Sequence, residues 1–153
     1  MPDPADTRIV VNSHILSQLD AEVKEESSGK RADPTALLSV IRKRRHVVCI
    51  TDNIMKEYAK TENSGQYLDL RGLLTSTVLQ LRDMGIAKRC RTGPIPDAPM
   101  LTGFGKQHIV FLQDAVRAHA RYLLTVNHLW LEKGAVGEVQ IVSSVRYVQL
   151  QES

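Results

Sequence analysis

The chain has 153 residues, of which 42% are hydrophobic and 24% charged, and this length suits one domain with its own buried core. Two cysteines, Cys49 and Cys90, are too few for a disulfide framework or a zinc quartet. The net charge of +3 and the pI of about 9.0 are compatible with nucleic-acid binding but also with many other functions.

No apolar run approaches the roughly 18 residues that a membrane-spanning helix needs. The short polar N-terminus does not resemble a signal peptide. We therefore expect a cytoplasmic protein without membrane contact, with residues 1–7 as a flexible N-terminus and residues 8–153 as a single domain.

Five short apolar runs predict strands, and polar or amphipathic segments separate them. Asp33 as N-cap and Pro34 at the first position predict the start of a helix, and Thr51 predicts the cap of the helix that carries Glu57. Ser143 or Ser144 caps a terminal helix. The predicted strands are 8–11, 47–50, 86–90, 122–125 and 139–142. The predicted helices are 15–20, 34–45, 52–60, 67–84, 107–120 and one ending at 150, with loops at 21–33 and 91–105 and a turn at 134–137.

Strands alternate with helices along the whole chain. This alternation predicts an α/β fold of three layers, α/β/α, with a central, mostly parallel sheet of four or five strands. Asn12 follows the first strand and Asn127 follows the run at 122–125. Open sheets of this class bind ligands outside the carboxyl ends of their strands, so we expect a site there.

Four segments in order resemble the PIN-domain family, in particular its short stand-alone members. The first segment, RIVVNSHIL, looks like the family's apolar strand followed by Asp-Thr-Asn. The second, VVCITDNIMKEYAK, looks like its second strand followed by a Ser/Thr cap and a Glu. The third, KQHIVFLQDAVRAHARYLLTVN, looks like its acid-capped helix, strand and Thr-x-Asp/Asn, and the fourth, VQIVSSVRYVQLQ, looks like its closing strand and terminal helix.

The resemblance implies a PIN-like nuclease fold. The family contains metal-dependent ribonucleases and endonucleases in which three or four carboxylates hold Mg²⁺ or Mn²⁺, and the metal activates water and stabilises charge on the phosphate. Carried over by position, the catalytic set is Asn12, Glu57, His108 and Asn127, with Asn12, Glu57 and Asn127 as the metal set. Glu57 alone is a carboxylate, so the metal site is expected to be weakened or lost, with Mg²⁺ or Mn²⁺ as the cofactor if one binds.

Each of these residues also has a structural interpretation. Glu57 is a metal ligand or a surface residue that pairs with Lys56 or Lys60, and His108 is a ligand or an ordinary residue at a helix start. Asn12 and Asn127 are ligands or polar residues that hydrogen-bond neighbouring loops.

Thr125 is expected first to hydrogen-bond the loop around Asn12. Trp130 is expected to pack under residues 132–138 rather than to stack on a base. Asp52 and Asp114 are not expected to replace the missing acids. The run Arg42, Lys43, Arg44 and Arg45 contacts nucleic acid or forms a solvated helix end.

Two functions follow from the PIN resemblance, and a small oligomer whose interface rather than its cleft matters is a third possibility. The first is a PIN-like protein of RNA processing or of the toxin–antitoxin type, with RNA and an antitoxin-like protein as partners. The alternative is a catalytically inert PIN-like module for binding or scaffolding. A homo-oligomer is expected in either case, because members of the family commonly dimerise.

Overall fold

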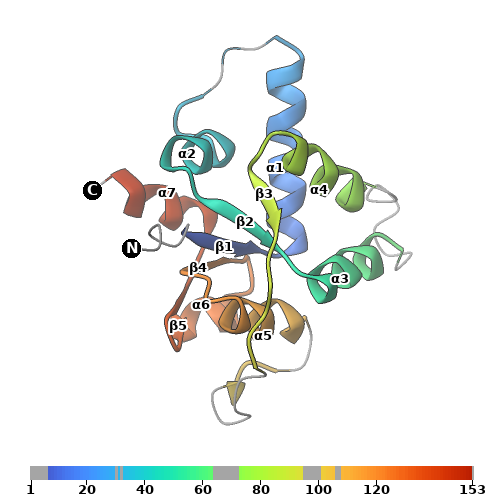
Figure 1. Cartoon of the computed structure of the whole chain (residues 1–153). Helices are drawn as coiled ribbons and strands as arrows, with labels where there is room; N and C mark the ends of the chain where they lie inside the picture. Colours follow the sequence, from blue (N-terminus) through green and yellow to red (C-terminus); the bar gives the residue numbers. More distant parts are fainter. Residues whose placement is uncertain are drawn as a thin grey trace, which may run out of the picture.

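Within the described residues, six strands form one sheet in the order β3-β2-β1-β4-β6-β5 (Figure 1). The computed structural model describes residues 7–29, 31, 33–63, 73–94, 101–105 and 108–152. Strands β3, β2, β1, β4 and β6 are parallel, and β5 pairs antiparallel with β6. The strands are β1 (Arg8–Val11), β2 (Val47–Ile50), β3 (Ala87–Arg89), β4 (Tyr122–Leu124), β5 (Ala135–Val136) and β6 (Val139–Val142).

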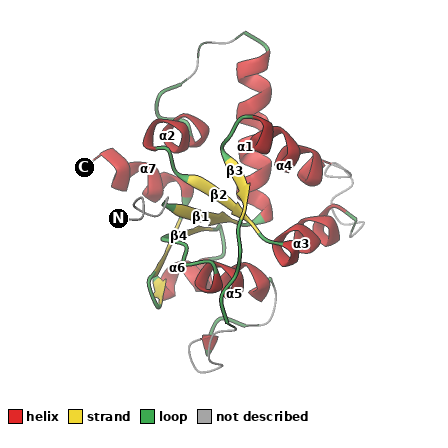
Figure 2. Ribbon diagram, viewed as in Figure 1, coloured by secondary structure: helices red, strands yellow, loops and turns green. Residues whose placement is uncertain are grey.

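Helices cover both faces of the sheet, which confirms the predicted three-layer α/β/α fold (Figure 2). Helices α1, α2 and α4 lie on one face and α5 and α6 on the other, while α3 contacts both α4 and α5. The helices are α1 (Ser13–Ser27), α2 (Leu37–Arg44), α3 (Asp52–Glu62), α4 (Leu73–Asp83), α5 (Ile109–Arg117), α6 (His128–Lys133) and α7 (Ser144–Glu152).

The first helix is longer than the sequence predicts. We expected a helix over 15–20 and a loop from 21, but α1 continues to Ser27. Val23 is buried on its apolar face, and Lys24 pairs with Asp20 one turn earlier at 2.9 Å. The acidic stretch is therefore the solvent side of an amphipathic helix, and charged residues alone did not mark a loop.

The predicted start of the second helix is wrong. Asp33 accepts hydrogen bonds from the backbone and the hydroxyl of Thr35, so it closes a turn instead of capping the helix. Helix α2 begins at Leu37, and Glu22 of α1 accepts the Leu38 N–H at 2.6 Å. A side chain from another helix thus supplies the cap that we assigned to a local residue.

The other local caps are confirmed. Thr51 accepts the Ile54 N–H at 3.0 Å, and Ser143 accepts the Arg146 N–H at 3.1 Å. The sequence did not predict α6, and the predicted turn at 134–137 contains the short strand β5, so the sheet of the described residues has six strands and not four or five. Parts of the predicted helices 67–84 and 107–120 and of the predicted loop 91–105 lie outside the described residues. No helix in the described part of the chain is long and apolar enough to cross a membrane.

Candidate functional site

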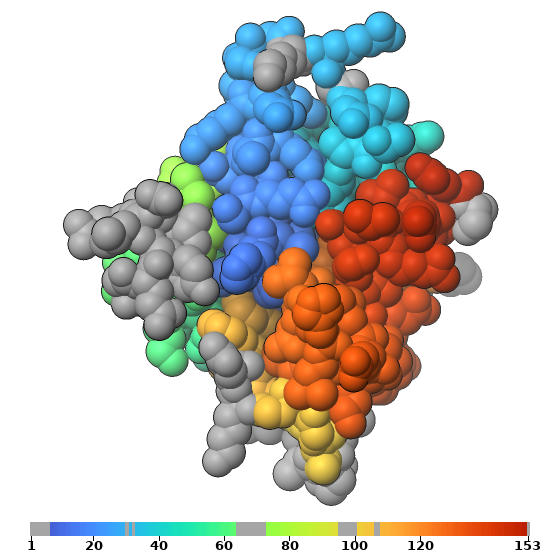
Figure 3. Space-filling view, turned by 180° about the vertical axis from the view of Figure 1, so that it is seen from behind, coloured from blue at the N-terminus to red at the C-terminus, as the bar shows by residue number. Residues whose placement is uncertain are grey.

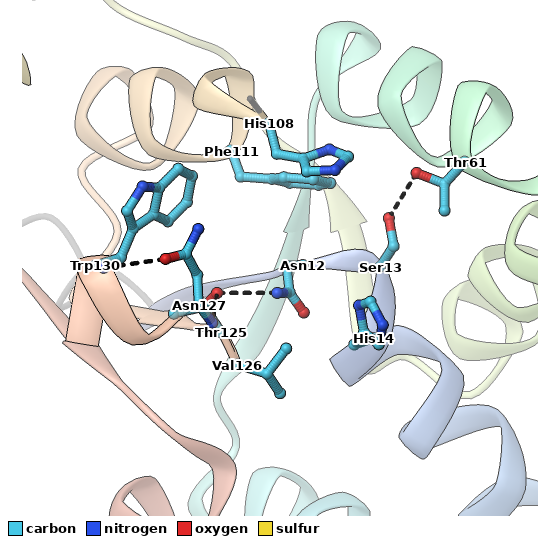
Figure 4. A pocket seen from close by; sticks show the side chains of 10 residues that line it. All are labelled: Asn12, Ser13, His14, Thr61, His108, Phe111, Thr125, Val126, Asn127 and Trp130. Atoms are coloured by element: carbon cyan, nitrogen blue, oxygen red, sulfur yellow. Dashed lines mark hydrogen bonds between the residues drawn. The ribbon is translucent and has the colours of Figure 1, made fainter. Parts of the chain in front are cut away.

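A cavity of about 230 Å³ opens at the carboxyl ends of β1 and β4 (Figure 4). The segments that line it come from α1, α5 and α6, and they meet in the middle of the face shown in Figure 3. Helix α3 contributes one further residue. The lining consists of Asn12, Ser13, His14, Thr61, His108, Phe111, Thr125, Val126, Asn127 and Trp130.

The two asparagines of this cavity cap helices. The Asn12 amide oxygen accepts the Ile15 N–H at 3.0 Å at the start of α1. The Asn127 amide oxygen accepts the Trp130 N–H at 3.2 Å at the start of α6. Each amide oxygen therefore already satisfies a backbone donor that the first turn of a helix leaves unpaired.

Thr125 joins the two caps. Its hydroxyl oxygen accepts the Asn12 side-chain N–H at 2.9 Å and the Asn127 backbone N–H at 3.1 Å. Thr125 is fully buried, and its hydroxyl holds together the segments that follow β1 and β4. The predicted contact between Thr125 and the loop around Asn12 is confirmed.

His108 forms the roof of the cavity together with Phe111 (Figure 4). His108 precedes α5 in the left-handed backbone conformation, with φ at 57°, and its side chain makes no cap hydrogen bond. Its Nδ1 lies 3.6 Å from Glu57 Oε2 of α3. A non-glycine residue in this conformation costs about 1 kcal/mol, which the surrounding structure must offset.

Glu57 lies behind His108 and is largely buried. Its carboxylate also forms an ion pair with Lys60 Nζ at 3.4 Å. Glu57 therefore faces one cation and one imidazole that is cationic when protonated. The structure thus brings Asn12, His108 and Asn127 onto one cavity, and Glu57 reaches it through His108.

Tyr58 positions the end of β1 beneath the cavity. Its hydroxyl donates to the Val11 carbonyl at 2.7 Å, and its ring packs against Phe111 with centroids 5.5 Å apart. Complete burial raises the pKa of Tyr58, so the phenol remains protonated and keeps donating.

The donor set of the cavity does not fit Mg²⁺ or Mn²⁺. These ions prefer carboxylate oxygens, whereas the two amide oxygens accept backbone N–H groups and Glu57 is paired. Over the described ranges, no group of three or more His, Cys, Asp or Glu side chains could hold a metal ion.

The two other acids near these segments belong elsewhere. Asp114 is buried and accepts hydrogen bonds from the hydroxyl of Thr51 and from Arg117, so it ties α5 to the start of α3. Asp52 is exposed and pairs with Arg89 at 2.9 Å.

The predicted basic run lies away from the cavity. It ends α2 just before β2 begins, whereas the cavity lies where β1 and β4 end, so the two occupy opposite edges of the sheet. Arg42 pairs with Glu26 at 2.9 Å, and Arg44 donates to the carbonyl of Gln151. Contact between this basic run and nucleic acid stays a prediction.

Comparisons with protein-family models, with curated proteins and with solved structures give no match for this chain. The residues of the cavity are therefore the basis for inferring its function.

Trp130 is buried as expected, and its ring packs against Phe104, whose carbonyl accepts the indole N–H at 2.6 Å; its packing under residues 132–138 stays a prediction. Other residues of the cavity were not predicted from the sequence. Thr61 and Phe111 lie on helix faces that reach the cavity only after the helices pack. The polar run Asn12, Ser13 and His14 after a buried strand was the available signal for α1.

Proposed function

We propose that this protein is a PIN-like RNA-binding module whose cavity binds a nucleotide of single-stranded RNA without metal-dependent cleavage. The observation that supports it is the meeting of Asn12, His108 and Asn127 around one cavity at the carboxyl ends of β1 and β4. At the positions where the resembled family carries acids, this chain offers amides and an imidazole.

Donor groups make the cavity suited to a phosphate or to base edges. The Asn127 oxygen is used by the cap, which turns its NH₂ group away from the helix and toward the space below α5 (Figure 4). The N-termini of α1 and α6 add positive partial charge at the same place. A carboxylate cluster would repel the phosphate unless a metal intervened, whereas these groups attract it directly.

Aromatic rings provide the apolar part of the surface. The His108 ring is partly exposed, and its centroid lies 6.2 Å from that of Phe111, whereas Phe111 and Trp130 are buried and form the apolar wall behind it (Figure 4). Proteins that read single-stranded RNA commonly combine backbone contacts with stacking of unpaired bases on exposed rings, and His108 would be that ring here. A duplex would not present a base to a recess of about 230 Å³.

The test is fluorescence anisotropy with a labelled single-stranded RNA of twelve nucleotides, in EDTA and then in Mn²⁺. We expect binding in both buffers, no cleavage, and weaker binding of the duplex. His108→Ala should weaken RNA binding about fivefold, because one hydrogen bond or ring contact contributes about 1 kcal/mol.

His119→Ala is the matched control. His119 also flanks α5, is exposed and has a left-handed backbone conformation with φ at 56°, but it lies at the other end of the helix. The control should bind RNA like the parent. Equal losses in both variants, or no RNA binding by the parent, would contradict the proposal.

The same assay tests the nuclease alternative. Cleavage in Mn²⁺ that Glu57→Gln abolishes would show that the remaining carboxylate is catalytic, and the protein would then be a ribonuclease. An antitoxin-like partner and a homo-oligomer stay predictions.

A further inference from the structure

Cys49 and Cys90 lie on neighbouring strands and on the same face of the sheet. Cys49 of β2 pairs in register with Lys88 of β3, and Cys90 follows two residues later, where side chains return to the same face. The Cys90 backbone N–H donates to the Ile50 carbonyl at 3.0 Å, so the ladder continues to this residue. The two side chains are therefore neighbours across the β2–β3 pair, close enough for each thiol to shift the pKa of the other.

The two cysteines differ in access to solvent. Cys49 is fully buried, whereas Cys90 is partly exposed and lines a separate open groove of about 820 Å³. Lys56, Arg89 and Arg91 line the same groove together with one acid, Asp52, which pairs with Arg89 at 2.9 Å. An oxidant can therefore reach Cys90 and not Cys49.

The electrostatic surroundings favour a thiolate at Cys90. The hydrogen bond from Cys49, followed by the charges of Arg8 and Lys88, lowers the pKa of Cys90 to about 7 against the effect of burial. The same hydrogen bond and burial raise the pKa of Cys49, which keeps its proton. Cys90 is therefore the nucleophile, and Cys49 is the thiol that keeps its proton.

We propose that Cys90 is a reactive thiol which a hydroperoxide oxidises and which then forms a disulfide with Cys49. The Cys90 sulfur bonds to one oxygen of hydrogen peroxide as the O–O bond breaks, which gives a sulfenic acid and releases hydroxide. The Cys49 sulfur then attacks the Cys90 sulfur, and the hydroxyl group leaves with the Cys49 proton as water. The disulfide joins the edge strand β3 to β2. The inference is independent of RNA binding.

The first test is alkylation by iodoacetamide as a function of pH. The rate for the parent should have its midpoint near pH 7, the value that the surroundings give Cys90. Cys49→Ala removes the hydrogen-bond donor and should move the midpoint upward by about one pH unit. Cys49→Ser keeps a donor and should restore the lower midpoint. A parent midpoint above pH 8 would overturn the proposal.

The second test is hydrogen peroxide treatment followed by Lys-C digestion without reductant. We expect residues 44–56 joined to residues 89–106, a mass two hydrogens lower, and reversal by dithiothreitol. Cys49→Ser should stop at the sulfenic acid, which dimedone traps at Cys90, and Cys90→Ser should show neither product. A disulfide between two molecules, or oxygen addition without any internal disulfide in the parent, would refute the inference.

Discussion

Restoring acids to the cavity tests whether its residues occupy the positions of a PIN-type metal site. The perturbation is the triple variant Asn12→Asp, His108→Asp and Asn127→Asp, beside the native Glu57. Asn12 and Asn127 are N-caps. Aspartate caps helices as well as asparagine does and also interacts favourably with the positive end of the helix. Asn12→Asp also removes the side-chain N–H that Thr125 accepts, so these two changes together should alter the free energy of unfolding by about 1 kcal/mol.

The destabilisation should come from position 108. The imidazole lies 3.6 Å from a Glu57 carboxylate oxygen, and an aspartate there would place a second negative charge beside it. Two like charges about 4 Å apart repel by about 4 kcal/mol at an effective dielectric constant of about 20. The side chain of residue 108 is 46% exposed, and solvent should reduce the loss to about 1–2 kcal/mol.

The assay is thermal unfolding with and without Mn²⁺. A loss of 1–2 kcal/mol lowers the melting temperature of a domain of this size by about 2–8 °C. Mn²⁺ at about a hundred times its dissociation constant would contribute about 2.7 kcal/mol to the folded state and reverse the loss. His108→Asn is the matched single control, since it removes the contact between the imidazole and Glu57 without adding charge.

Two results would refute this reasoning. If His108→Asp and His108→Asn melt at the same temperature, residue 108 does not repel Glu57. If Mn²⁺ raises the melting temperature of the parent as much as that of the triple variant, either the native cavity already binds metal or these positions do not form one site.

Three further predictions concern the elements around the cavity. Asp114→Ala should lower the free energy of unfolding by about 3 kcal/mol, measured by urea titration, because it leaves the buried Thr51 hydroxyl and a cation without their acceptor; a change below 1 kcal/mol would contradict it. Burial, with smaller effects of nearby arginines, holds the pKa of His46 below its usual 6.5. Because the unfolded chain then binds the proton more readily than the folded chain, stability should fall as the pH decreases from 6.5. Thermal melts between pH 7 and 5 should show a flatter dependence of stability on pH for His46→Gln than for the parent. Glu62→Gln should weaken the start of α4 by about 1 kcal/mol, since its buried carboxylate accepts the Leu74 N–H at 3.1 Å; unchanged hydrogen exchange in α4 would disprove this.

Much of the site could be anticipated, because its positions follow from strand ends. Asn12 and Asn127 come directly after buried strands, and parallel strands bring their carboxyl ends to one edge. Only the family resemblance placed His108 and Glu57 in one set, because their spacing in the sequence does not predict a contact. It depends on how α5 packs against α3, and these residues are far apart in the chain.

The sequence by itself determined the three layers and the alternation of the five parallel strands with most of the helices, but not α6 or β5. Short apolar runs and the local caps Thr51 and Ser143 depend on neighbours within a few residues, so a linear pattern carries them. Only the tertiary structure decided that Glu22 caps α2 and that Cys49 lies next to Cys90. It also decided that the amide oxygens of the cavity asparagines accept backbone N–H groups at the starts of helices. Those contacts join residues from different elements or depend on a side-chain direction, and packing selects one partner among several that the sequence allows.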